Sequence, residues 1–328
     1  MLSRRAFLLS TLAASTASTL ARAQPAPTSG GASGAPPTVL RIARRGIEVN
    51  GKPASVLGIR QPDGTFGITT QVDKRFRVHL ENTLNEPSLI HWHGLTPPWQ
   101  QDGVPGVSGP PIPPGGSADY DFLLRFGGTF WMHSLIIRDQ RDRPDQQEVI
   151  VMLADFSFTP PDQIFAEVKK GGSMPPGAMT GTSSSAPAPA NVKGKAEGTM
   201  APGMTMGGTA AKPDLNDVKY DAFLANDRTL GDPEVVKVEP GGRVLLRIIN
   251  SSSMSAFHVD LGPLDGELIA VDGFRIAPVV ARRFPIAVAQ RLDIRLAIPR
   301  APAAYPVLAV LEGESRQTGV ILQARGAP

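Results

Sequence analysis

Residues 90–95 read Ile90-His91-Trp92-His93-Gly94-Leu95 and set two imidazoles two positions apart. The surrounding residues 87–93 are typical of a β-strand, in which side chains two positions apart leave the same face. Neutral imidazole is a common nitrogen ligand of copper and zinc. The two rings can therefore share a metal ion, although His-x-His spacing alone more often marks two ordinary histidines.

Three further peptides follow this one along the chain. They are Asp102-Gly103-Val104-Pro105-Gly106-Val107, Pro111-Ile112-Pro113-Pro114-Gly115-Gly116 and Gly128-Thr129-Phe130-Trp131-Met132-His133-Ser134. Together, in this order, the four peptides resemble the multicopper oxidase family. Residues 243–250, 253–257 and 269–273 look like the middle domain of its three-domain members, so the resemblance covers nearly all of the mature chain.

The resemblance implies copper as the cofactor and assigns ligands by position. His91 looks like a type 2 copper ligand, and His93 and His133 look like type 3 copper ligands. Asp102 corresponds to an acidic residue that, in the family, relays protons to oxygen bound at the copper cluster. Because Asp-Gly is also a favoured turn dipeptide, a turn and a proton relay both remain open for Asp102.

The chain departs from the family in its ligand set. None of its 328 residues is cysteine, whereas a type 1 copper needs a cysteine sulfur together with histidines. In the family this site and the remaining cluster histidines belong to a third domain, and the chain stops at Pro328 before any such segment. Three histidines fall short of a trinuclear cluster but can hold one copper ion. His79 and His258 match no ligand position and are expected to be structural.

A second departure follows Ser134. The family has another histidine there and then a connection, but here Leu135-Ile136-Ile137-Arg138-Asp139 follows at once and resembles the next strand. A loop is therefore missing, and residues 130–137 contain no glycine, proline or asparagine for a turn between antiparallel strands. We expect that the two strands merge or that their pairing differs from the family's, with loss of catalysis and a compromised fold.

The leader and the net charge indicate where the protein works. Residues 1–23 combine Arg4-Arg5, an apolar stretch and Ala21-Arg22-Ala23, as in a twin-arginine signal peptide with its cleavage site. This predicts export of the folded protein to the periplasm, without a membrane span in the mature form.

The net charge of the mature chain is close to zero. Removing the three arginines of the leader leaves 30 basic against 30 acidic residues. A near-neutral protein gives no reason to expect a nucleic-acid partner.

Short strand signals separated by turn residues predict an all-β protein, and the resemblance specifies two cupredoxin-like Greek-key β-sandwich domains. The expected boundaries are a flexible tether at 24–37, domain 1 at 38–158 and domain 2 at 219–325. Residues 159–218 are expected to form a short helix at 162–170 and then a disordered linker rich in Met, Gly and Pro. The expected strands are 39–43, 76–81, 89–93, 119–124, 128–133, 148–153, 234–238, 243–249, 267–271, 292–297 and 318–322.

Five of the nine methionines lie in the linker. Thioethers are soft ligands that favour Cu(I), and copper-resistance members of the family often carry methionine-rich insertions. Chance enrichment in a tolerant loop is the alternative. The candidate Cu(I) ligands are Met174, Met179, Met200, Met204 and Met206.

These observations leave three functions open. The first is an exported copper-binding protein, a truncated multicopper oxidase with a partial type 2/type 3 site and no independent oxidase activity. The second is an oxidoreductase of the laccase or cuprous oxidase type, which reduces O2 to water and is completed by a separate chain that carries the third domain. The third is a metal-free structural envelope protein or a gene fragment. Whether the chain acts as an enzyme stays open.

Overall fold

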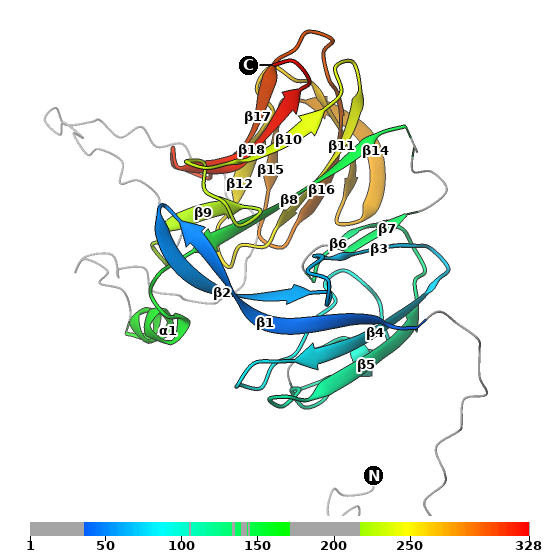
Figure 1. Cartoon of the computed structure of the whole chain (residues 1–328), viewed down its shortest axis with the longest axis vertical. Helices are drawn as coiled ribbons and strands as arrows, with labels where there is room; N and C mark the ends of the chain where they lie inside the picture. Colours follow the sequence, from blue (N-terminus) through cyan, green and yellow to red (C-terminus); the bar gives the residue numbers. More distant parts are fainter. Residues whose placement is uncertain are drawn as a thin grey trace, which may run out of the picture. The chain divides into compact units, whose positions relative to one another are not determined.

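The computed structural model describes residues 36–104, 106–132, 135–138, 143, 145–170 and 217–327, and nearly all of its regular elements are β-strands (Figure 1). The all-β prediction is therefore confirmed. Within these residues the strands form four sheets, two in each of two β-sandwiches. The helix α1 (Pro161–Lys169) lies close to its predicted position and has a proline in its first turn, where the missing N–H costs no hydrogen bond.

The N-terminal sandwich, as we define it, contains a four-stranded and a three-stranded sheet. The first has the order β2 (Lys52–Arg60), β1 (Thr38–Val49), β4 (Arg75–Asn82), β5 (Ser117–Leu123), and the second has the order β3 (Ile68–Gln71), β7 (Leu135–Arg138), β6 (Gly128–Phe130). Phe76, Val78 and Leu80 alternate inward along β4, as the two-residue period of a strand requires. They pack in one cluster with Phe130 and Ile137 of the other sheet.

The C-terminal sandwich contains a five-stranded and a six-stranded sheet. The first has the order β10 (Glu234–Val238), β18 (Gln317–Ala324), β17 (Ala304–Leu311), β12 (Phe257–Asp260), β15 (Arg283–Ile286). The second has the order β14 (Phe274–Ala281), β13 (Gly266–Val271), β16 (Arg291–Ala297), β11 (Arg243–Asn250), β8 (Gln147–Phe156), β9 (Ala222–Ala225). The strand β8, which follows the N-terminal sandwich along the chain, pairs in parallel with β11.

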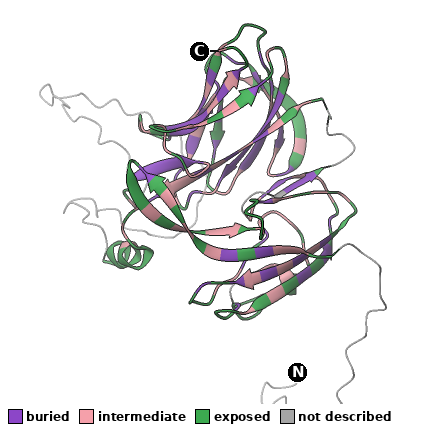
Figure 2. Cartoon of the chain, in the orientation of Figure 1, coloured by how far each residue is buried: buried purple, intermediate pink, exposed green. Residues whose placement is uncertain are grey.

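Both faces of β11 are buried (Figure 2). Val244, Leu246 and Ile248 point into the core of the C-terminal sandwich, and the alternate residues leave the opposite face. Strand β6 of the N-terminal sandwich contacts β11 and β16. The two sandwiches therefore meet along this face, next to the segment that leads to His133.

Two local predictions need correction. Residues 87–93 do not form a regular strand, because only Ser88 and His93 make isolated bridges, to Ile112 and Trp131. Of the two alternatives expected after Ser134, merged strands are wrong, because β6 and β7 pair as an antiparallel hairpin with Phe130 opposite Leu135. A pairing different from the family's stays a prediction. Four residues therefore connect the two strands, which is room for a turn without glycine or proline. The last two of these, His133 and Ser134, lie outside the described residues.

None of the described helices is long and apolar enough to cross a membrane. The leader, residues 24–35 of the tether and most of the linker, including its five methionines, lie outside the described residues. The predictions for these segments therefore stay predictions.

Candidate metal centre

Trp92 fixes the direction of the two histidines beside it. Its side chain is fully buried in the N-terminal sandwich, where Phe76 and Tyr120 each meet the indole edge to face with ring centroids 4.9 Å apart. The neighbouring residues in an extended backbone point the other way. The rings of His91 and His93 accordingly lie together, with centroids 5.5 Å apart and planes nearly perpendicular.

His91 is held by the segment around Asp102. Its Nδ1 lies 2.7 Å from the backbone oxygen of Asp102, and 3.5 Å from the Asp102 carboxylate oxygen Oδ1. A carbonyl oxygen only accepts, so Nδ1 is the donor, and in the neutral tautomer with this hydrogen bond Nε2 carries the lone pair. Hydrogen bonds of this kind orient imidazoles that bind metals through the other ring nitrogen.

Gly103 lets this segment approach His91. It has φ +71°, and a Cβ at this position would lie 1.6 Å from the backbone oxygen of Ile90. Only glycine avoids that collision and adopts this φ without strain. Asp102 follows a short 3-10 helix, η1 (Trp99–Gln101), and its N–H donates to the Trp99 oxygen at 3.3 Å, while its own oxygen is the hydrogen-bond acceptor of His91. The role of Asp102 as a proton relay stays a prediction.

His93 is tied to the segment that leads to His133. Its backbone N–H donates to the oxygen of Trp131 at 2.9 Å, and its oxygen accepts from the Trp131 N–H at 3.3 Å. The His93 and Trp131 rings also lie against each other, with centroids 5.4 Å apart. Burial, followed by the nearby charge of Arg291, lowers the pKa of His93. Its imidazole is therefore neutral near pH 7, the form in which it can bind a metal.

The described residues include two of the three predicted metal ligands, His91 and His93. No group of three or more histidine, cysteine, aspartate or glutamate side chains gathers in metal-binding geometry among them. His133 stands two residues after Trp131 but lies outside the described part, as do all five candidate methionines. His79 lies on β4 with its Nδ1 2.8 Å from the Asp119 carboxylate, and His258 lies on β12. Two imidazoles with ring centroids 5.5 Å apart are donor types that fit copper.

No sequence motif indicates that residues of the C-terminal sandwich reach this site. Arg291 of β16 donates from Nε to the backbone oxygen of Thr129 at 3.3 Å. A Cβ on Gly94, the residue after His93, would lie 2.4 Å from Nη2 of Arg291. Arg291 stands about 160 residues after Thr129 and about 200 after Gly94 in sequence, so only the folded chain brings them together.

Comparison with known proteins supports the copper chemistry. Two family models, both described as multicopper oxidase, match residues 46–144 and 148–325. A copper resistance protein A homolog of Pseudomonas syringae pv. tomato is 31% identical over 261 residues, which are 71% of this chain and 42% of that protein. The multicopper oxidase MmcO of Mycobacterium tuberculosis is 25% identical over 279 residues, which are 80% of this chain and 51% of that protein.

Solved structures share the fold. The laccase from Botrytis aclada superposes with a TM-score of 0.66 at 20% identity, covering 89% of this chain and 54% of the laccase. Fet3p, a multicopper oxidase that functions in iron import, gives a TM-score of 0.64 at 17% identity, covering 88% of this chain and 53% of Fet3p. This chain spans about half or less of the length of the two curated relatives named above.

Proposed function

This chain belongs to the multicopper oxidase family, whose cofactor is copper, and we propose that it is an exported copper-binding protein with a partial type 2/type 3 copper site. The observation that carries the proposal is the pairing of His91 with His93. Their rings lie together on the face opposite the buried Trp92, and the proton on Nδ1 of His91 is directed to Asp102. The free Nε2 of His91 and the neutral His93 ring are suitable donors for copper.

His133 supplies a third nitrogen in this proposal. The hydrogen bonds between His93 and Trp131 keep the two chain segments in register, and residue 133 follows two positions later. Asp102 takes the role of proton relay, since its carboxylate lies 3.5 Å from the His91 ring. The linker residues Met174, Met179, Met200, Met204 and Met206 bind Cu(I) transiently, because thioethers are soft ligands.

The chain does not turn over dioxygen by itself in this proposal. A type 1 copper requires a thiolate, and none of the 328 residues is cysteine. Electrons from a reducing substrate therefore need an entry site supplied by another polypeptide segment. Residues 1–23 direct export by the twin-arginine route to the periplasm, where the copper resistance function named for the relatives would take place.

The second candidate function is an oxidase completed by a partner chain with a third cupredoxin domain. It is favoured by the exposure of His91, because 42% of its side chain remains accessible to solvent. Further ligands on an added domain could thus reach a copper ion bound there. The reaction would then be oxidation of a phenol or a metal ion with reduction of O2 to water, as in laccases and cuprous oxidases.

The test is copper per chain at equilibrium in the mature protein, with oxygen consumption measured on the same samples. We expect about one tightly held copper ion, bound by the wild type and by a His79→Ala control, and lost in His91→Ala/His93→Ala. Oxygen consumption should be absent in each. If the double variant keeps the copper of the wild type, the assignment of these ligands is wrong. Turnover by the isolated chain would contradict the proposed lack of oxidase activity.

A further inference from the structure

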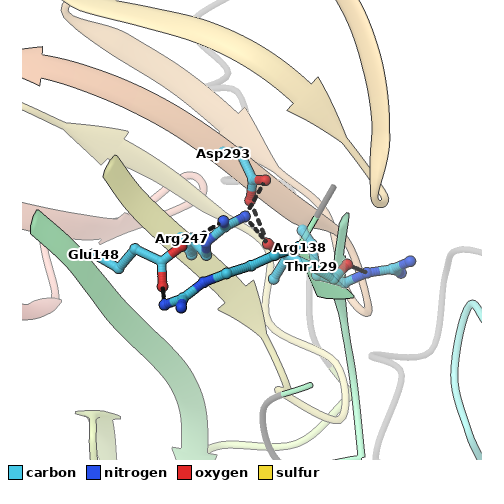
Figure 3. Close-up of polar contacts among 6 residues, drawn as sticks. Thr129, Arg138, Glu148, Arg247 and Asp293 are labelled. Atoms are coloured by element: carbon cyan, nitrogen blue, oxygen red, sulfur yellow. Dashed lines mark hydrogen bonds and ion pairs between the residues drawn. The ribbon is translucent and has the colours of Figure 1, made fainter. Parts of the chain in front are cut away.

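Thr129 of β6 is held on two sides by the C-terminal sandwich (Figure 3). Its side chain is fully buried, and its hydroxyl donates to the Asp293 carboxylate at 2.5 Å and accepts from Nη1 of Arg247 at 3.1 Å. Its backbone oxygen accepts from Nε of Arg291 at 3.3 Å. Arg291 and Asp293 stand two residues apart on β16, so they leave the same face of the strand and reach Thr129 together.

Arg291 makes further contacts that fix its own position. Its side chain is only 4% exposed. Nη2 donates to the backbone oxygen of Asp272 at 3.0 Å and Nη1 to that of Ala289 at 2.9 Å, while the Asp272 carboxylate lies 3.1 Å from Nη1. A guanidinium has five N–H donors in a rigid plane. With three backbone oxygens and a carboxylate around that plane, the group has little freedom to move.

The same guanidinium fills the space beneath the turn that follows His93. Gly94 has φ +88°, and a Cβ there would lie 2.4 Å from Nη2 of Arg291 and 3.1 Å from the Phe130 ring. Any side chain at position 94 would collide with the Arg291 guanidinium. One side chain of the C-terminal sandwich thus touches the turn after His93 and the strand that leads to His133.

We propose that Arg291 is a positioning residue of the copper site, which fixes the spacing between the turn after His93 and strand β6. The inference rests on the proposed function, because it needs copper to be bound there. Arg291 holds the turn at Gly94 against the Thr129 backbone, and the His93–Trp131 hydrogen bonds transmit that spacing to the ligands. The C-terminal sandwich thereby contributes to copper affinity without supplying a ligand. Loss of groups that orient ligands typically costs about 10- to 100-fold in metal affinity.

The test compares Arg291→Lys and Thr129→Val with wild type and with a control, Arg282→Gln. Arg282 is also an arginine of the C-terminal sandwich, but it pairs with Asp265 on the surface, with both side chains more than half exposed. The lysine keeps the charge of Arg291 and loses the planar fork, and the valine keeps the shape of Thr129 and loses the hydroxyl. Thermal unfolding shows which variants fold, and only folded variants are compared.

Two readouts separate this inference from the proposed function. In the metal-free protein, hydrogen exchange at residues 91–95 and 128–132 should be at least about tenfold faster in Arg291→Lys than in the control. With copper, affinity should fall by about 10- to 100-fold and the Cu(II) electron paramagnetic resonance spectrum should change, which loss of stability elsewhere would not cause.

If the wild type binds no copper, the proposed function fails, whereas faster exchange alone would still support the spacing role. Unchanged exchange together with unchanged affinity in a folded Arg291→Lys variant would overturn the inference. If Arg291→Lys does not fold, hydrogen exchange and copper affinity are measured on Thr129→Val instead, and the same outcomes support or overturn the inference.

Discussion

Arg247 and Asp293 form an ion pair inside the protein, with Nη1 of Arg247 2.7 Å from Oδ2 of Asp293 and side-chain exposures of only 2% and 7%. The pair is extended on both sides. Nη2 of Arg247 reaches Glu148 at 2.7 Å, and Glu148 in turn accepts from Arg138 of β7 at 2.5 Å. Charges taken out of water are costly unless each is paired, so the cluster favours one arrangement of β7, β8, β11 and β16 (Figure 3).

Replacing Asp293 with alanine should be strongly destabilising. The change removes the carboxylate that pairs with the buried Arg247 charge, and breaking a buried pair in this way costs about 3–5 kcal/mol. Urea unfolding of the metal-free protein measures the loss. The matched control is Asp265→Ala, which removes an exposed pair with Arg282 and should cost less than about 1 kcal/mol. Equal losses of unfolding free energy in the two variants would contradict the stabilising role of the buried Arg247–Asp293 pair.

Gly103→Ala should weaken copper binding more than Gly106→Ala does. The two glycines have nearly the same φ, +71° and +73°, so alanine carries a similar left-handed strain at both. Only at Gly103 does the new Cβ meet the backbone, 1.6 Å from the Ile90 oxygen, whereas nothing lies within 4 Å at Gly106. Copper titration of both variants measures the difference. Similar copper affinity in the two would mean that the Asp102 segment does not support His91.

The metal-free protein should lose stability as the pH falls below about 6.5. Burial, and then the charge of Arg291, lowers the pKa of His93 in the folded state. The unfolded chain therefore takes up its proton first, at the ordinary imidazole pKa of about 6.5. The stabilisation is complete above that pH and is lost as the pH falls through the folded pKa. His93→Asn should flatten this part of the curve of unfolding free energy against pH, and an unchanged curve would contradict the assignment.

Two substitutions of Trp92 should distinguish its role in packing from its role in directing His91 and His93 outward. Trp92→Ala leaves a cavity between Phe76 and Tyr120 and should cost about 3–5 kcal/mol, the usual range for a buried aromatic residue. We expect copper affinity to fall with it, because the buried indole turns the flanking histidines outward. Trp92→Phe fills most of the space and should keep most of the affinity. Denaturant unfolding and copper titration on the same samples compare the two, and strong copper binding by Trp92→Ala would contradict the role of the indole.

Strands with a clear alternation of buried and exposed residues were predictable from the sequence. The expected strand 76–81 lies within β4, and the expected strand 234–238 coincides with β10. Strand β14 was missed, because most of its residues are exposed and Pro278 interrupts it. Residues 87–93 have the composition of a strand, but their backbone groups pair only at single bridges, which depends on where the chain segments around Ile112 and Trp131 pass.

The candidate site was predictable in part. The order of the four peptides singled out His91, His93, His133 and Asp102, and the structure brings the first two together beside the last. The support from Arg291, Thr129 and Asp293 was not predictable. These residues carry no motif, and β16 meets β6 only through tertiary packing across about 160 residues of chain.

Pulsed electron paramagnetic resonance on the Cu(II)-loaded mature chain tests the central claim most directly. We predict couplings from at least two imidazole nitrogens in the wild type and in His79→Ala, with one coupling lost in His91→Ala and one in His93→Ala. A spectrum without imidazole couplings, or one that both single variants leave unchanged, would contradict a copper site at His91 and His93.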